Sequence, residues 1–105
     1  MTDGILHLVN SYQWYDMIER GEKLEEYRDI STWEKVISKC HMMIYANGIT
    51  VPTDVKQICF HRGYTNTTML RDVEEIYVGK GRPEWGAPNY PVFIIRLKKV
   101  RRKRK

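Results

Sequence analysis

The sequence predicts a single α+β domain, a small five-stranded β-barrel with two short helices beside it. Five short segments are rich in aliphatic and β-branched residues, a composition typical of β-strands. Two other segments repeat apolar residues every three to four positions, which is the period of an amphipathic helix. The chain has 105 residues, the length of one ordinary domain, and five short strands of this kind fit a small barrel.

The first strand is expected at Ile5–Val9, a short and mostly apolar run with β-branched ends. Because apolar residues occupy both of its faces, we expect this strand to lie in the centre of the sheet. Asn10 or Ser11 follows directly, and either side chain can cap the amino terminus of a helix. The strand is therefore predicted to lead straight into the first helix.

The first helix is indicated by Trp14, Met17 and Ile18, which share one helical face. We expect this face to pack on the core. Gly21 suits the position just past the helix, where glycine adopts the left-handed conformation most easily. A glycine there lets the chain reverse into a second strand at Lys23–Arg28.

The second helix is predicted from a capping box, with Ser31 as the N-cap and Glu34 reaching back from the third helical position. Apolar side chains then recur at helical spacing, and we expect them to pack on the core rather than to hold a cofactor. They are Trp33, Val36, Ile37 and Cys40. Glycine and proline interrupt any regular element that follows, so residues 46–56 are expected to form a long loop.

Three more strands complete the barrel, at Val55–His61, Met69–Val78 and Val92–Leu97. In the second of these, the parity of the core-facing residues changes between Val73 and Ile76, which indicates a β-bulge between them. The last strand is apolar on both faces, so we expect it to be buried on both.

Charges of both signs alternate in the stretch from Gly21 to Arg28. Side chains two positions apart on a strand share a face, so Glu26 and Arg28 are expected to project together, with Lys23 at the strand mouth. A carboxylate beside a guanidinium and near an ammonium group can orient a polar ligand by hydrogen bonds of both senses. The alternative is a surface ion pair on an edge strand, which stabilises a protein only weakly.

The stretch Gly21–Arg28 has the spacing GxKxxExR, which resembles the signature of the ASCH domain family, a branch of the PUA-like β-barrels. Two later stretches, Phe60–Tyr64 and the residues from Val78 to Pro88, resemble further segments of that family. The three occur in the family's order. The resemblance implies a PUA-like ASCH domain over residues 1–97, followed by a basic tail at residues 98–105 that is expected to be disordered.

ASCH domains are similar to RNA-binding PUA domains, so the resemblance implies binding of RNA or a modified nucleotide in a cleft between the helices and the barrel. Glu26 and Arg28 are candidates for reading the edge of a base. Tyr27, Tyr64 and Trp85 are candidates for stacking on it, although a single aromatic ring is more often a packing residue. The predicted ligand-binding residues are Lys23, Glu26, Tyr27, Arg28, Arg62 and Tyr64.

A hydrolase of the same family is the alternative function, because some relatives cut RNA and a group of short relatives removes the acetyl group of N4-acetylcytidine. In that second group the lysine of the motif acts with a threonine three residues later, whereas this chain has Glu26 at that place. Lys23 and Glu26 are the candidate catalytic pair. Lys23 would polarise a phosphate or carbonyl oxygen, and Glu26 would act as general base.

The net charge of +5 is concentrated at the carboxyl terminus. Seven cationic residues follow position 97, so the preceding part of the chain is net acidic. Such a tail can neutralise phosphates in a sequence-independent, salt-sensitive way, or it can be a solvated terminus. The candidate backbone contacts are Lys98, Lys99, Arg101, Arg102, Lys103, Arg104 and Lys105. A third alternative is therefore an adaptor whose tail recruits nucleic acid while the barrel binds a protein.

Two cysteines are too few for a disulfide framework. Cys40-His41 and Cys59-x-His61 contain zinc-ligand types, but adjacent residues are an awkward spacing for a structural zinc site, so we expect no metal site and no cofactor. The first residues lack a basic segment, which argues against a signal peptide, and no apolar run approaches the about 18 residues of a membrane span. The expectation is a cytoplasmic protein without a membrane partner.

Overall fold

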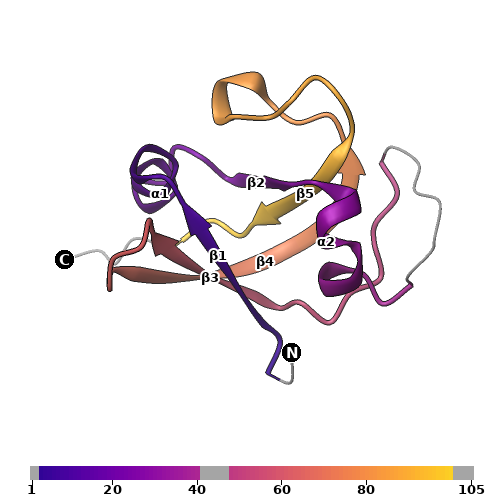
Figure 1. The fold of residues 1–105 in the computed structure, drawn as a ribbon, viewed down its shortest axis with the longest axis horizontal. Helices are drawn as coiled ribbons and strands as arrows, with labels where there is room; N and C mark the ends of the chain where they lie inside the picture. The colour runs from indigo at the N-terminus through magenta and orange to yellow at the C-terminus, as the bar shows by residue number, and fades with distance from the viewer. Residues whose placement is uncertain (1–2, 41–47, 101–105) are drawn as a thin grey trace.

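The computed structural model describes residues 3–40 and 48–100 (Figure 1). Within these ranges, five strands and two α-helices form a compact α+β fold, which confirms the predicted class. The strands are β1 (Ile5–Asn10), β2 (Glu25–Arg28), β3 (Gln57–Arg62), β4 (Thr68–Gly79) and β5 (Val92–Leu97). The helical elements are α1 (Tyr12–Glu19), α2 (Ile30–Ile37) and a short 3₁₀ helix, η1 (Pro83–Trp85).

The strands form one sheet in the order β1-β3-β4-β5-β2, and this sheet curls into a half-barrel (Figure 1). β1 runs parallel to β3, whereas the other neighbouring pairs are antiparallel. A parallel pair needs a long crossover connection. Here that connection contains α1, β2 and α2, so the first part of the chain crosses the molecule before β3 begins.

The central position predicted for β1 is wrong, because β1 stands at one end of the strand order. Leu6 and Leu8 are buried, whereas His7 and Val9 on the opposite face are exposed, Val9 by 42%. Val9 thus contributes to the apolar appearance of the segment without entering the core. Single exposed apolar residues of this kind are ordinary on protein surfaces.

The core lies between the inner face of the sheet and the helices. α1 contributes Tyr15 and Ile18 to this core, and α2 contributes Ile37. Trp14 and Met17, predicted to share the core face with Ile18, are only half-buried, while Tyr15 is 1% exposed. The buried face of α1 is therefore centred on Tyr15, and Trp14 lies at the border of the core, where it can reach the surface.

The capping box predicted at Ser31 is wrong, because α2 begins two residues earlier. Asp29 is the N-cap, and its carboxylate accepts a hydrogen bond from the backbone N–H of Thr32 at 3.2 Å. Ser31 Oγ donates to the same carboxylate at 2.5 Å instead of capping the helix. An aspartate accepts from several donors at once. α2 ends at Ile37, and Val36 and Cys40 are exposed.

The later strands follow the prediction closely. β3 begins two residues after the expected start, and β4 is one residue longer at each end. The bulge expected in β4 is confirmed by a register shift between Val73 and Glu75. β5 has the predicted bounds, and five of its six residues are buried. None of the helices in the described ranges is long and apolar enough to cross a membrane.

Candidate ligand-binding site

The end of α1 sets the direction of β2. Gly21 has a φ of +80°, and its backbone N–H donates to the Ile18 carbonyl at 3.0 Å. The next N–H, of Glu22, donates to the Met17 carbonyl at 2.9 Å. This left-handed glycine cap is the one expected from the sequence. It turns the chain so that Lys23 enters the protein and β2 follows along β5.

Lys23, Glu26 and Arg28 form a charge cluster on and beside β2. Glu26 Oε1 accepts a hydrogen bond from Lys23 Nζ at 3.0 Å, and Oε2 accepts one from Arg28 Nη2 at 2.7 Å. Glu26 and Arg28 therefore share a face, as predicted. The cluster is not a surface ion pair, because Lys23 is 1% exposed and Glu26 is 6% exposed. Its geometry instead locks the Glu26 carboxylate between two cations.

Lys23 is held on all sides. Its Nζ also donates to the Glu25 carbonyl, and it lies 5.8 Å from the centre of the Trp14 ring and 5.1 Å from that of Tyr27. Aromatic faces attract a cation and help to compensate for the loss of its hydration. The sequence placed Lys23 at a free strand mouth, whereas the structure places its ammonium group inside. In this position Lys23 orients Glu26.

A surface hollow of about 260 Å³ opens above the cluster, and we call it the aromatic hollow. β2, the end of β1, the start of α1 and the turn after η1 provide its walls. Its lining residues are Val9, Asn10, Ser11, Trp14, Glu26, Tyr27, Arg28, Trp85 and Gly86. The motif residues of β2 thus meet two tryptophans that lie far from them in the sequence.

Two buried donors in this hollow have no hydrogen-bond partner within the described part of the chain, Asn10 Nδ2 and Arg28 Nε. Asn10 accepts from Arg28 Nη2 through its Oδ1 at 2.7 Å, so the two side chains hold each other in place. A buried donor without a partner costs about 1–3 kcal/mol. Most buried polar groups in proteins are paired, but both of these atoms are closed to solvent, so a bound molecule reaches them only after neighbouring side chains shift.

Tyr27 fixes the loop that carries Trp85. Its hydroxyl donates to Glu25 Oε1 at 2.7 Å and accepts from the backbone N–H of Arg82 at 3.0 Å. Burial and the neighbouring Glu25 carboxylate raise the pKa of Tyr27, so the hydroxyl stays protonated. The Arg82 guanidinium lies 4.7 Å from the centre of the Trp85 ring. Trp85, one of the predicted candidates for stacking, lines the hollow.

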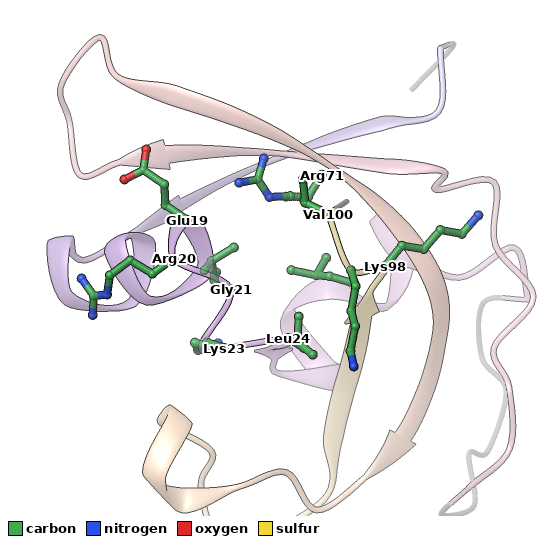
Figure 2. A pocket seen from close by; sticks show the side chains of 11 residues that line it. Glu19, Arg20, Gly21, Lys23, Leu24, Arg71, Lys98 and Val100 are labelled. Carbon is green, nitrogen blue, oxygen red and sulfur yellow. The ribbon is translucent and has the colours of Figure 1, made fainter. Parts of the chain in front are cut away.

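A second hollow of about 410 Å³ lies at the end of α1 (Figure 2), and we call it the basic hollow. Five cationic residues and Glu19 line it, although the ammonium group of Lys23 is directed toward Glu26. The cationic residues are Arg20, Lys23, Arg71, Lys98 and Lys99. Lys98 and Lys99, predicted to contact a nucleic-acid backbone, are exposed here. The other predicted tail contacts, Arg101 to Lys105, lie outside the described residues.

Arg62 and Tyr64 do not line either hollow within the described residues. Arg62 binds Asp16 through two hydrogen bonds of 2.9 Å and lies 4.1 Å from the centre of the Tyr12 ring. The Arg62 guanidinium holds the pKa of Asp16 below its usual value. Tyr64 is 98% exposed. Both predicted binding residues are therefore separate from the charge cluster.

Sequence reasoning missed Asn10 and Trp14 in the aromatic hollow and Arg20 and Arg71 in the basic hollow. Asn10 was considered only as a helix cap and Trp14 only as a core residue. A polar side chain that directly follows an apolar strand was the available signal for Asn10, since such residues gather at sheet ends.

No family model matches the chain, and no curated protein or solved structure is found to be similar to it. Membership of the ASCH family stays a prediction.

Proposed function

We propose that the protein binds single-stranded RNA or a modified nucleotide and holds one base in the aromatic hollow. The observation that carries this proposal is the aromatic hollow itself, in which Glu26 and Arg28 of the motif meet Trp14 and Trp85. A base presents a flat face for stacking on an aromatic ring and an edge of hydrogen-bonding groups held in one plane. The resemblance of Gly21–Arg28 to the ASCH signature points to the same class of ligand.

The dimensions and walls of the hollow suit a single base. Its volume of about 260 Å³ is below the roughly 300–1,000 Å³ of common small-molecule sites. Trp14 and Trp85 lie in its wall, and stacking on an aromatic side chain contributes about 1–3 kcal/mol per base. The Glu26 carboxylate accepts from two cations and has lone pairs left for an exocyclic amine. A base has one flat ring with acceptor atoms and an exocyclic amine as donor, and these features fit the two tryptophans and the Glu26 carboxylate.

The basic hollow is suited to the phosphates of the same ligand. A third hollow, of about 420 Å³, shares Leu24, Leu97 and Lys99 with the basic hollow and shares Trp85 with the aromatic hollow. The three hollows therefore follow one another along the surface. A single strand with its base beside Trp85 has a route along which its backbone meets Arg82, Arg96 and Lys99, although Glu25 and Glu74 also line the third hollow; cationic grooves of this kind follow the backbone in single-strand binding proteins.

Binding without turnover is the function that this geometry supports best. The candidate catalytic pair, Lys23 and Glu26, is engaged in mutual ion pairing, and Lys23 is almost fully buried. A general base must reach the proton that it abstracts. The remaining capacity of Glu26 suits recognition of a base edge.

Asn10→Asp is expected to weaken binding about tenfold or more. The variant keeps an acceptor for Arg28 but adds a second carboxylate next to Glu26 in the wall of the hollow, and this negative charge repels the acceptor atoms of a base; a loss of about 1.4 kcal/mol corresponds to a factor of ten. Calorimetric titration with single nucleosides, N4-acetylcytidine and short single-stranded RNA measures the effect. Asn66→Asp, in an exposed turn, is the control with the same change of charge.

Two results would contradict the proposal. Absence of binding to every one of these ligands by the wild type would remove it. Equal affinities of Asn10→Asp and Asn66→Asp would show that the aromatic hollow does not bind the ligand. If both variants also keep the RNA affinity of the wild type, the adaptor alternative is favoured, in which the tail alone contacts nucleic acid.

Replacing both Lys98 and Lys99 with glutamine is expected to flatten the salt dependence of RNA binding. Each phosphate contact to a single strand contributes about 0.7 to the slope of log K against log salt, so two lost contacts reduce the slope by about 1.4. Binding assays at several salt concentrations measure it. Lys39→Gln with Lys56→Gln removes two exposed lysines that line none of the three hollows and is the control. An unchanged slope would exclude Lys98 and Lys99 from the phosphate contacts.

A further inference from the structure

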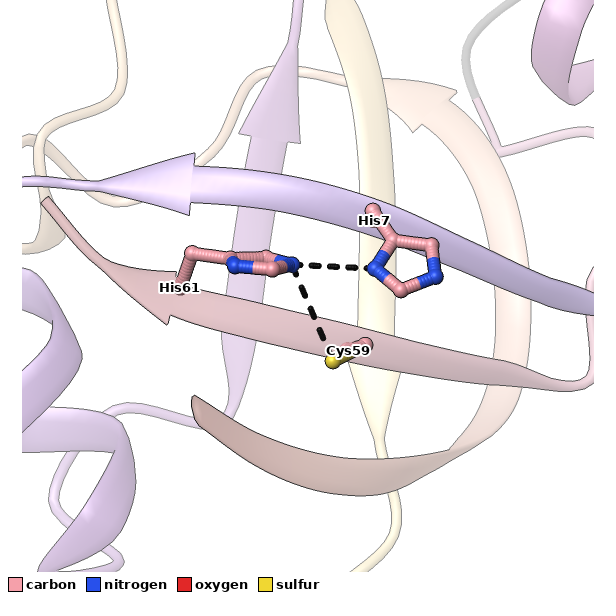
Figure 3. A group of neighbouring side chains, drawn as sticks. All are labelled: His7, Cys59 and His61. Carbon is pink, nitrogen blue, oxygen red and sulfur yellow. Dashed lines mark hydrogen bonds between the residues drawn. The ribbon is translucent and has the colours of Figure 1, made fainter. Parts of the chain in front are cut away.

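Three potential metal ligands converge on the outer face of the β1–β3 pair (Figure 3). His7 of β1 is in register with Cys59 of β3, and His61 follows Cys59 by two residues on the same face of β3. Leu6 and Leu8 of β1, like Ile58 and Phe60 of β3, point the other way, into the core. The alternation that buries these apolar side chains therefore brings two imidazoles and one thiol together at the surface.

The three side chains lie within metal-ligand range of one another. His7 Nδ1 is 2.9 Å from His61 Nε2, and Cys59 Sγ is 3.8 Å from the same nitrogen. All three potential ligand atoms lie within 4.8 Å of one another. In the absence of a metal, one imidazole donates a hydrogen bond to the other, and this ordinary arrangement explains the short nitrogen–nitrogen distance.

Two of the three separations are already close to those of tetrahedral zinc geometry. Zinc–nitrogen bonds of about 2.0–2.1 Å and zinc–sulfur bonds of about 2.3 Å place ligand atoms about 3.3–3.6 Å apart in a tetrahedron. The observed separations of 2.9 Å and 3.8 Å lie on either side of this range. His7 is exposed and His61 is half-buried, so rotation of their side chains can open the space for an ion.

We propose that His7, Cys59 and His61 form a three-ligand site for Zn²⁺, with the fourth position open to solvent. One thiolate and two imidazoles are donors that zinc prefers, whereas magnesium and calcium prefer oxygen ligands. The sequence analysis considered a different set, in which Cys59 and His61 would join Cys40 and His41, and it predicted no metal site. The structure supplies His7 instead, because β1 pairs in parallel with β3.

A bound ion would tie β1 to β3. β1 stands at the end of the strand order, and β3 is its neighbour in the sheet. Zinc that binds the folded chain stabilises it in proportion to the logarithm of its concentration. None of the three hollows is lined by these ligands, so this site is independent of the proposed nucleotide binding.

Titration of the reduced full-length chain with Co²⁺, followed by displacement with Zn²⁺, tests the site. We expect one Co²⁺ per chain, a thiolate-to-cobalt charge-transfer band, and loss of that band on addition of Zn²⁺. Cys59→Ser should abolish the band, and His7→Ala should weaken binding at least tenfold. Cys40→Ser combined with His41→Ala is the control that leaves the proposed ligands in place, and it should behave as the wild type.

A second measurement guards against misfolded variants. The thermal unfolding midpoint of the wild type should rise with Zn²⁺ concentration, whereas that of Cys59→Ser should not, although both have the same circular dichroism without metal. The proposal is overturned if the wild type shows no one-to-one binding, if Cys59→Ser keeps the band, or if the control variant loses it.

Discussion

Glu26→Gln is expected to lower the free energy of unfolding by about 3–5 kcal/mol, the range for removing one partner of a buried ion pair. The substitution leaves the Lys23 ammonium group inside the protein without its counter-charge. Lys23 is 1% exposed and contacts Glu26 at 3.0 Å, so water cannot replace the lost carboxylate. Urea-induced unfolding followed by tryptophan fluorescence measures the difference.

Lys23→Met should have a smaller effect, of about 1–3 kcal/mol. Glu26 keeps its ion pair with Arg28 at 2.7 Å in this variant, and the methionine side chain fills most of the space of the lysine stem. Comparing the loss of unfolding free energy in the two variants therefore tests whether Lys23 needs Glu26 as its counter-charge more than Glu26 needs Lys23. A larger loss in Lys23→Met than in Glu26→Gln would contradict this account of the charge cluster.

Glu22→Gln is the matched control for these measurements. Glu22 pairs with Arg20, and both side chains are more than half exposed. Exposed ion pairs contribute little to stability, so this control should lose much less than Glu26→Gln. If Glu26→Gln lowers the free energy of unfolding no more than this control does, the buried cluster stabilises the protein no more than an exposed ion pair.

Gly81→Ala is expected to lower the free energy of unfolding by about 1–3 kcal/mol, as overpacking of a well-packed region does. A Cβ atom at position 81 would lie 2.5 Å from Cζ and 2.7 Å from Cδ1 of Tyr27. The ring must move, and its hydroxyl then loses its contacts with Glu25 and with the backbone of Arg82. The Trp85 loop moves with it, so the proposed base binding should fall as well.

Two comparisons make this prediction specific. Gly79→Ala places its Cβ at an ordinary contact of 3.4 Å from Ile94 Cδ1, and it should be milder. In Tyr27→Ala the obstructing ring is absent, so adding Gly81→Ala to that variant should cause little further loss. Equal effects of Gly81→Ala in the presence and absence of the Tyr27 ring, measured by chemical unfolding, would exclude the clash as the cause.

The elements that were predicted well depend on short-range patterns. β5 has its predicted bounds because its apolar run is uninterrupted, and the β4 bulge follows from a change of parity between Val73 and Ile76. The α2 cap was misassigned because Asp29 and Ser31 are both good caps, and the sequence alone offered no way to choose between them. The strand order could not be predicted from the sequence, because β1 has the composition of a central strand but lies at one end of the sheet order.

The sequence by itself determined that Glu26 and Arg28 share a face, because the two-residue period of a strand is a local property. It also determined the turn at Gly21, which needs only a residue without a Cβ atom. Only the tertiary structure decided that Lys23 is buried, that Asn10 and two tryptophans surround the motif, and that His7 meets Cys59 and His61. These contacts join residues distant in the chain, and they depend on how the sheet curls and which strands become neighbours.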